Sequence, residues 1–181
     1  METPLKAELK LTPLTALHRS LGATMVDFAG YDMPLQYPGG IVGEHRQVRE
    51  KAGLFDVSHM GPALLSLPER GGADAHAKIS AIFEPLVCGD IAGLEPGEMR
   101  YTLLLDENGG ILDDLMVARP PEPEAQGALY IVVNAGTKEA DFARISERCA
   151  GAKLERLDHD HALIALQGPA ARRVLSAIVP E

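Results

Sequence analysis

The feature that most constrains this chain is a glycine turn that leads into an apolar segment carrying two adjacent aspartates. The segment runs from Gly109 to Val117 and reads GGILDDLMV. Side chains alternate between the two faces of a strand, so Asp113 and Asp114 are expected on opposite faces of a sheet. At least one carboxylate then lies beside apolar side chains, where burial raises its pKa unless it is paired or hydrogen-bonded. Such a group serves either a structural network or chemistry, and the pattern leaves both open.

Hydrophobic patterning around this segment predicts helices interspersed with hairpins. Apolar residues at helical spacing predict helices near residues 14–21, 41–52, 75–83, 137–149 and 169–178. Strand patterns cover residues 62–67, 99–105, 111–117, 129–133 and 163–166, with a hairpin turn at Asn108-Gly109. Pro34 and Pro38 make the extended stretch 23–37 an edge strand or an ordered loop. The sequence therefore predicts an α+β fold with a mixed or mostly antiparallel sheet and packed helices.

Each predicted helix is expected to bury an apolar stripe against the rest of the fold. The second helix carries Ile41, His45, Val48 and Ala52 on this stripe, and the last one carries Val174, Leu175 and Ile178. The segment 129–133 is nearly continuous in apolar residues, which is typical of a central strand.

The charge distribution argues against nucleic acid binding. The 181 residues carry 17 basic and 26 acidic side chains, a net charge of −9, and residues 61–125 alone hold 4 basic and 12 acidic ones. A nucleic acid surface needs a basic stripe, whereas an acidic segment suits solubility, a small-molecule site or a basic partner. Cys88 and Cys149 lie outside metal or redox spacings, which favours a reducing cytoplasm, and no apolar run is long enough to cross a membrane.

Two polar clusters have alternative interpretations. Asp56, Ser58 and His59 suggest a hydrolase triad, but triad members usually come from separate parts of a fold. A corner between a helix and a strand, held by local side-chain hydrogen bonds, is favoured, and the lining of a ligand pocket stays open. The tripeptide His159-Asp160-His161 offers two histidines to a metal, yet no third ligand is near, so a polar turn is favoured.

Seven short motifs follow one another along nearly the whole chain. They are Thr12-Pro13-Leu14, the segment 25–30 (MVDFAG), the segment 33–37 (MPLQY), the segment 55–60 (FDVSHM), the segment 109–115 (GGILDDL), the segment 132–135 (VVNA) and the segment 165–169 (ALQGP). In this order they resemble the N-terminal part of aminomethyltransferase, the T protein of the glycine cleavage system. Each motif alone is modest evidence, and the seven in order are specific.

The resemblance implies a reaction and a site. A T protein takes the aminomethyl group from the lipoyl arm of the H protein and transfers its one-carbon unit to tetrahydrofolate, so that ammonia leaves and 5,10-methylenetetrahydrofolate forms. The resemblance implies that Asp114 is catalytic and promotes attack by N5 of the folate. Met60, Tyr101, Val132 and Asn134 match folate contacts, with apolar walls from Met60 and Val132 and a hydrogen bond from Asn134 to the pterin edge. It implies no metal.

Members of that family are much longer than this chain and form a ring of domains around the folate. The resemblance therefore implies that residues 1–181 are the N-terminal part of the folate-binding region, truncated before the later domains. We expect this part alone not to catalyse the full reaction. Removal of the other part is expected to expose apolar surface and to favour self-association.

Two related alternatives stay open. One is the folate domain of an enzyme like dimethylglycine or sarcosine dehydrogenase, which usually follows a flavin domain. The other is a non-catalytic folate-binding protein of the iron–sulfur maintenance type, whose members often lack the intact Asp-Asp segment. The presence of Asp114, and a helix cap at Thr12 soon after Met1, favour the aminomethyltransferase.

Overall fold

The computed structural model describes residues 8–159 and 161–179, which fall into two compact units. Unit 1 consists of residues 8–59 together with 162–179, and unit 2 of residues 60–159 and 161. The predicted α+β class is confirmed in both. Every paired strand among the described residues is antiparallel, while the isolated bridge between Lys10 and Tyr31 is parallel.

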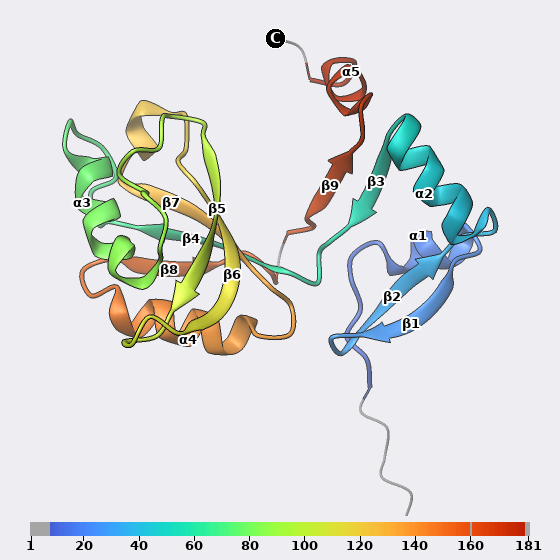
Figure 1. Ribbon diagram of the computed structural model, residues 1–181, viewed down its shortest axis with the longest axis horizontal. Helices are drawn as coiled ribbons and strands as arrows, with labels where there is room; N and C mark the ends of the chain where they lie inside the picture. The colour runs from blue at the N-terminus through green and yellow to red at the C-terminus, as the bar shows by residue number, and fades with distance from the viewer. Residues whose placement is uncertain (1–7, 160, 180–181) are drawn as a thin grey trace, which may run out of the picture. The chain divides into compact units, whose positions relative to one another are not determined.

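Unit 2 is built on a five-stranded antiparallel sheet with the order β5-β6-β7-β4-β8 (Figure 1). The strands are β4 (Gly61–Ser66), β5 (Met99–Leu105), β6 (Ile111–Ala118), β7 (Ala128–Val133) and β8 (Lys153–Arg156). The helices are α3 (Ala75–Phe83) and α4 (Lys138–Arg148), with the short 3-10 turns η1 (Glu84–Leu86) and η2 (Pro123–Ala125). The segment 129–133, predicted to be central, lies in the third strand of the five.

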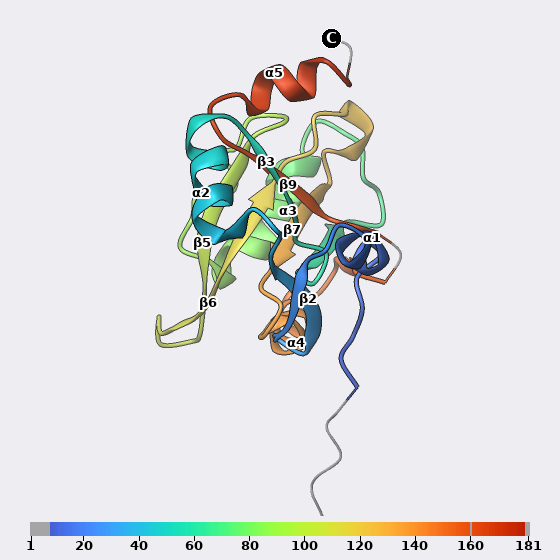
Figure 2. The same ribbon diagram turned by 90° about the vertical axis from the view of Figure 1, so that its right-hand side faces the viewer.

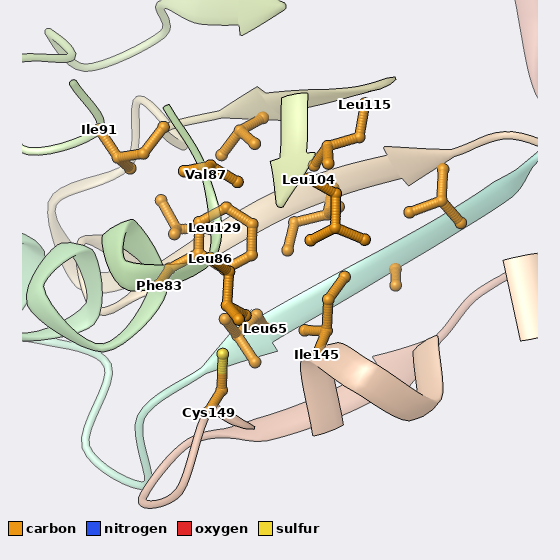
Figure 3. Close-up of a cluster of buried hydrophobic side chains, with 14 of the residues drawn as sticks. Leu65, Phe83, Leu86, Val87, Ile91, Leu104, Leu115, Leu129, Ile145 and Cys149 are labelled. Atoms are coloured by element: carbon orange, nitrogen blue, oxygen red, sulfur yellow. The ribbon is translucent and has the colours of Figure 1, made fainter. Parts of the chain in front are cut away.

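The core of unit 2 lies between one face of this sheet and the two helices. Phe83 from α3 and Ile145 from α4 point toward strand residues such as Leu65 and Leu129 (Figure 3). All four side chains are fully buried. The predicted inner faces of these two helices are therefore confirmed, because the apolar stripe of each helix packs against buried apolar residues of the strands.

Unit 1 combines a two-stranded hairpin, a second two-stranded sheet and three helices. Its elements are α1 (Thr15–Ser20), β1 (Thr24–Phe28), β2 (Tyr31–Gln36), α2 (Gly40–Glu50), β3 (Gly53–Asp56), β9 (Ile164–Gln167) and α5 (Ala171–Ser176). β1 pairs with β2, and β3 pairs with β9, which lies beside it in both views (Figures 1 and 2). Pro34 fits within β2 because a strand of a two-stranded sheet has an unpaired edge.

Two helices of unit 1 form as predicted, but the prediction of their buried faces is wrong. No residue of α2 or α5 is buried, and Ile41 of α2 and Leu175 of α5 are 55% and 53% exposed. An apolar stripe fixes which face of a helix seeks a partner, but burial also requires an apolar surface opposite it. The described residues leave the apolar side chains of both helices uncovered.

Asp56 anchors unit 1 through contacts that are distant in sequence. Its buried carboxylate accepts hydrogen bonds from His18 Nε2 at 2.8 Å and from the Thr12 hydroxyl at 2.7 Å. Burial alone would raise the pKa of Asp56, but these donors and Ser58 outweigh it and lower that pKa. Ser58 exchanges hydrogen bonds with the backbone of Leu163, so Asp56 and Ser58 each serve the fold rather than a triad.

Gly168 is expected to tolerate no side chain. Its φ is +114°, and a Cβ there would lie 2.5 Å from the carbonyl oxygen of Lys51 and 2.6 Å from that of Val48. Gly168→Ala is therefore expected to lower the free energy of unfolding by at least about 2 kcal/mol. The measurement is chemical unfolding, with Gly43→Ala in α2 as the control, because a Cβ at Gly43 meets nothing within 4 Å. Equal stabilities of the two variants would contradict the argument.

Candidate functional site

Strand alternation places Asp113 and Asp114 on opposite faces of the unit 2 sheet. Asp113 lies on the core face, where it pairs with the buried Leu104 across the strands and where the next residue of β6 on the same face is the buried Leu115. Asp114 lies on the other face and pairs with Leu103 of β5. The expected division of the pair is therefore present, with one carboxylate turned toward the helices and one turned away from them.

The residues predicted to bind folate lie on neighbouring strands of the same sheet. In register, Met116 of β6 faces Tyr101 of β5 on one side and Val132 of β7 on the other, which puts Tyr101 and Val132 on the Asp114 face. Met60 directly precedes Gly61 of β4, and Asn134 directly follows Val133 of β7, so both lie at the end of the two strands where Gly61 pairs with Val133. The structure thus brings all five predicted site residues to one region of unit 2.

Tyr101 is held beside the Asp114 carboxylate. Hydrogen bonding to the nearby Asp114 carboxylate, together with partial desolvation and the two aspartate charges, raises the pKa of the Tyr101 hydroxyl. The phenol stays protonated at neutral pH, so it acts as a donor. Tyr101 is 66% exposed, which leaves its ring available to a ligand on this face.

Asp113 serves as an acceptor that joins three elements. Its Oδ1 accepts a hydrogen bond from Asn134 Nδ2 at 3.0 Å, and its Oδ2 accepts one from the Thr137 hydroxyl, next to α4. Burial alone would raise the pKa of Asp113, but these bonds outweigh it and lower that pKa. Burial was expected to raise the pKa only of a carboxylate without pairing or hydrogen bonds, and Asp113 is surrounded by hydrogen-bond donors.

Asn134 is fixed by the two donors of its amide group. Nδ2 donates to Asp113 Oδ1 and to the backbone carbonyl of Asp114, both at 3.0 Å. An asparagine amide carries two donor hydrogens, so both are committed within unit 2. Among the described residues, no donor contacts its Oδ1, so Asn134 offers an acceptor to a ligand.

Apolar side chains complete the region. Val132 is 4% exposed, and Met60 and Met116 are half-buried. The backbone carbonyl of Met60 accepts a hydrogen bond from the buried Lys138 Nζ at 3.5 Å, which ties this end of β4 to α4. The region therefore combines one carboxylate, one phenol donor, one amide acceptor and apolar walls.

Comparison with known proteins identifies the family. A family model described as the GCVT N-terminal domain matches residues 14–181. The chain belongs to this family.

Relatives of this GCVT N-terminal domain carry the name aminomethyltransferase. The protein from Geobacillus thermodenitrificans is 42% identical over 94% of the chain, and the one from Streptomyces coelicolor is 42% identical over 94%. The mitochondrial aminomethyltransferase of Dictyostelium discoideum is 38% identical over 96%. The crystal structure of glycine cleavage system aminomethyltransferase T from Bartonella henselae is similar with a TM-score of 0.80 and 39% identity over 93% of the chain.

The chain spans well under half the length of these relatives. It covers 43% of the Geobacillus and Streptomyces proteins, 42% of the Dictyostelium protein and 43% of the Bartonella chain. The family and the fold of the GCVT N-terminal domain are established over this part, whereas the activity, substrates and partners of the longer relatives are taken up below as a proposal.

Sequence reasoning missed two buried charged groups on α4 of this GCVT N-terminal domain. Asp141 is 4% exposed and Lys138 is 3% exposed. Burial, with the charges of Asp113 and Asp114, raises the pKa of Asp141 to about 7. The available signal was their spacing, because Lys138 and Asp141 share the helical stripe of Phe142 and Ile145. Charged residues on an apolar stripe are almost always paired or functional.

Further features of the described residues bear on metals and membranes. Residues 8–159 and 161–179 contain no group of three or more histidine, cysteine, aspartate or glutamate side chains that could hold a metal ion. Asp160 of the tripeptide discussed above lies outside the described residues. No helix in the described part of the chain is long and apolar enough to span a membrane.

Unit 1 of the GCVT N-terminal domain holds a separate groove of about 670 Å³ between β2, α2 and β3. Exposed apolar side chains line it, among them Leu35, Ile41 and Leu54. None of the predicted folate contacts lies in this groove.

Proposed function

We propose that residues 1–181 form the aspartate-bearing, N-terminal part of the folate-binding region in a tetrahydrofolate-dependent aminomethyltransferase of the glycine cleavage system. The substrate is the aminomethyl group on the lipoyl arm of the H protein, and the products are ammonia and 5,10-methylenetetrahydrofolate. The observation that carries the proposal is the placement of Asp114 beside Tyr101 and Val132 on one sheet face, away from the helices. The names of the relatives support the same reaction class.

The groups in this region fit a reduced pterin. A pterin ring is flat and mostly apolar on its faces, while its edge carries several donors and acceptors. Val132, Met116 and Met60 suit the faces. The free acceptor of Asn134 suits an N–H on the pterin edge, so Asn134 is proposed to accept rather than donate.

Asp114 is proposed as the catalytic residue. Tetrahydrofolate supplies the nucleophilic nitrogen, and positive charge develops at the one-carbon unit as ammonia leaves. A carboxylate fixed beside that centre stabilises the developing charge and can accept a proton. Tyr101, as the hydrogen-bond donor to Asp114, holds the carboxylate in position.

The remaining length of the relatives is proposed to complete the folate pocket and the surface for the H protein. The exposed apolar side chains of unit 1 are consistent with additional protein or with the self-association expected from the sequence, and both stay predictions. The cytoplasmic location likewise stays a prediction. Names of the relatives favour an aminomethyltransferase over the dehydrogenase-like and iron–sulfur maintenance alternatives.

Titration of tetrahydrofolate into residues 1–181 by calorimetry tests the proposal. We expect saturable binding that Asp114→Ala weakens by roughly 10- to 100-fold, because a hydrogen bond to a charged group contributes about 1.5–3 kcal/mol. Glu122→Ala, in the exposed turn between β6 and β7, is the control and is expected to bind as the unmodified chain does. Equal affinity of the Asp114→Ala variant would contradict the role of Asp114. The absence of binding by any form would contradict a folate site within this part.

A further inference from the structure

A buried carboxyl group lies directly behind the Asp113–Asn134 contact. Asp141 occupies the first turn of α4 and is 4% exposed. Its backbone N–H donates a hydrogen bond to the Thr137 carbonyl, and the Thr137 hydroxyl donates one to Asp113 Oδ2, so the Asp141 and Asp113 carboxyl groups lie beside the same residue. Among the described residues, Asp141 Oδ2 has no hydrogen-bond partner. Two carboxyl groups placed side by side are expected to hold a proton between them, because two adjacent carboxylates repel each other.

The hydrogen bonds decide which carboxyl group holds that proton. Both oxygens of Asp113 accept bonds, from Asn134 and from Thr137, so Asp113 is the charged acceptor. Asp141 has a buried oxygen without a donor, and a charge there would be desolvated and uncompensated. The neutral, proton-bearing member is therefore Asp141.

We propose that Asp141 is a positioning residue of the Asp114 site, which donates its proton to Asp113 and thereby fixes Asp113 and Asn134. The chain of contacts runs from Asp141 to Asp113, then to the Asn134 amide, which also holds the backbone carbonyl of Asp114. Asp141 touches no ligand in this scheme. It sets the direction in which Asn134 presents its acceptor and the position of the strand that carries Asp114.

The charges around Asp141 favour the protonated form up to neutral pH. Burial is the largest influence, and the Asp113 contact and the negative charges of Asp113 and Asp114 on β6 act in the same direction. The hydrogen bond of Thr137 acts against them, and the balance raises the pKa of Asp141 to about 7. The nearest cations on α4 are engaged elsewhere: Lys138 pairs with Asp158 at 3.0 Å, and Arg144 binds the Leu105 carbonyl and Glu107. Loss of the proton above this pH converts a donor into a second negative charge beside Asp113.

The effect of Asp141 on folate binding rests on the proposed function, but the contacts of Asp141 can be tested without folate. Nuclear magnetic resonance of residues 1–181 reports the Asn134 side-chain amide and the carboxyl carbons of Asp113 and Asp141. Between about pH 5 and pH 9 we expect the Asn134 amide signals to move with the ionisation of Asp141. The midpoint is expected at about 7, while Asp113 stays ionised.

Two substitutions separate positioning from simple packing. Asp141→Asn keeps a neutral donor of the same shape, so the Asn134 signals should match those of the unmodified chain at low pH and lose their pH dependence. Asp141→Ala removes the donor and should displace these signals at every pH. Glu147→Gln, on the exposed face of the same helix, is the matched control and should leave the titration unchanged.

The results that overturn the proposal are specific. An Asp141 carboxyl carbon that titrates near an ordinary aspartate value, of about 4, would show that Asp141 holds no proton at neutral pH. Asn134 signals that do not respond to Asp141, or an Asp141→Asn variant that behaves like Asp141→Ala, would show that Asp141 does not position Asn134. A signal that moves between about pH 5 and pH 9 because of a histidine is told apart from one that follows Asp141, because it keeps its pH dependence in the Asp141→Asn variant.

The folate measurement then distinguishes this proposal from the proposed function. If the unmodified chain binds tetrahydrofolate, Asp141→Ala is expected to weaken this binding about 10-fold, a change of about 1.4 kcal/mol. Asp141→Asn is expected to bind tetrahydrofolate equally at neutral and higher pH. If the unmodified chain binds no tetrahydrofolate while Asn134 still follows Asp141, the folate site fails and the positioning role stands. If tetrahydrofolate binds but the Asn134 signals do not respond to Asp141, the folate site stands and the positioning role fails.

Discussion

Asp114→Asn is expected to lower the rate of 5,10-methylenetetrahydrofolate formation by at least about 100-fold, within the range typical for loss of one general acid–base or electrostatic group. Asparagine has the same shape as aspartate and still accepts a hydrogen bond from Tyr101, so the fold of β6 should be unchanged. What is lost is the negative charge beside the reacting carbon. The effect should therefore fall on kcat more than on KM.

The assay for this substitution uses a form of the protein as long as its relatives. Residues 1–181 are joined to the part of the Geobacillus thermodenitrificans relative that lies beyond its matched segment, and aminomethylated H protein and tetrahydrofolate are supplied. The unmodified fusion sets the reference rate, and Glu122→Gln is the matched change of charge in an exposed turn. A loss of less than about threefold for Asp114→Asn would be too small for a catalytic carboxylate.

Asp158→Asn is expected to lower the free energy of unfolding of unit 2 by about 3 to 5 kcal/mol, the usual cost of breaking a buried ion pair from one side. Asp158 Oδ2 lies 3.0 Å from Lys138 Nζ and 2.9 Å from Arg156 Nη2, and the Asp158 and Lys138 side chains are each 3% exposed. Removal of the carboxylate takes the counter-charge away from a lysine that also binds the Met60 carbonyl.

Chemical unfolding at neutral pH measures this effect. Glu155→Gln is the matched control, because Glu155 is half-exposed and reaches Arg70 and Lys153 only at 3.9 and 4.0 Å. Its stability should change by less than about 0.5 kcal/mol. If Asp158→Asn and Glu155→Gln are equally mild, the Lys138–Asp158 pair does not stabilise unit 2.

The pH dependence of the same pair has a definite sign. Burial alone would raise the pKa of Asp158, but the hydrogen bonds and charges of Arg156 and Lys138 outweigh it and lower that pKa well below 3.8. The unfolded chain therefore binds a proton at Asp158 before the folded chain does. The stabilisation is present above about pH 4 and decreases as the pH falls below it, and Asp158→Asn should lose this acid-sensitive part.

The strands of unit 2 were predictable because they are long, alternating and bounded by turns. The segment 99–105 is found as β5 with the same bounds, and the segment 129–133 is found within β7. β3 and β8 were missed, since each has four residues and at most two large apolar side chains. The buried faces of α2 and α5 were predicted wrongly, because an apolar stripe does not reveal whether a partner surface is present.

The candidate site was predictable only in part. The neighbouring aspartates and strand alternation were sufficient to separate Asp113 from Asp114, and the resemblance identified the residues beside them. The contact between Asp113 and Asp141 joins a strand and a helix 28 positions apart in sequence, and no local pattern encodes it. The direction of the pKa shift of Asp113 was left open by the sequence for the same reason, since its donors come from Asn134 and Thr137 after the next strand.

The chain order of the two units has a consequence for synthesis on the ribosome. Residues 60–161 form one uninterrupted unit, whereas β3 ends at Asp56 and its partner β9 begins at Ile164. All strands of the Asp114 sheet therefore emerge before β9, so this sheet can form while β3 still has a free edge. Pairing of β3 with β9 is a late, long-range event, and such contacts form slowly and expose strand edges in the meantime. A nascent chain from which β9 has not yet emerged would carry a complete aspartate-bearing sheet and an unfinished first unit.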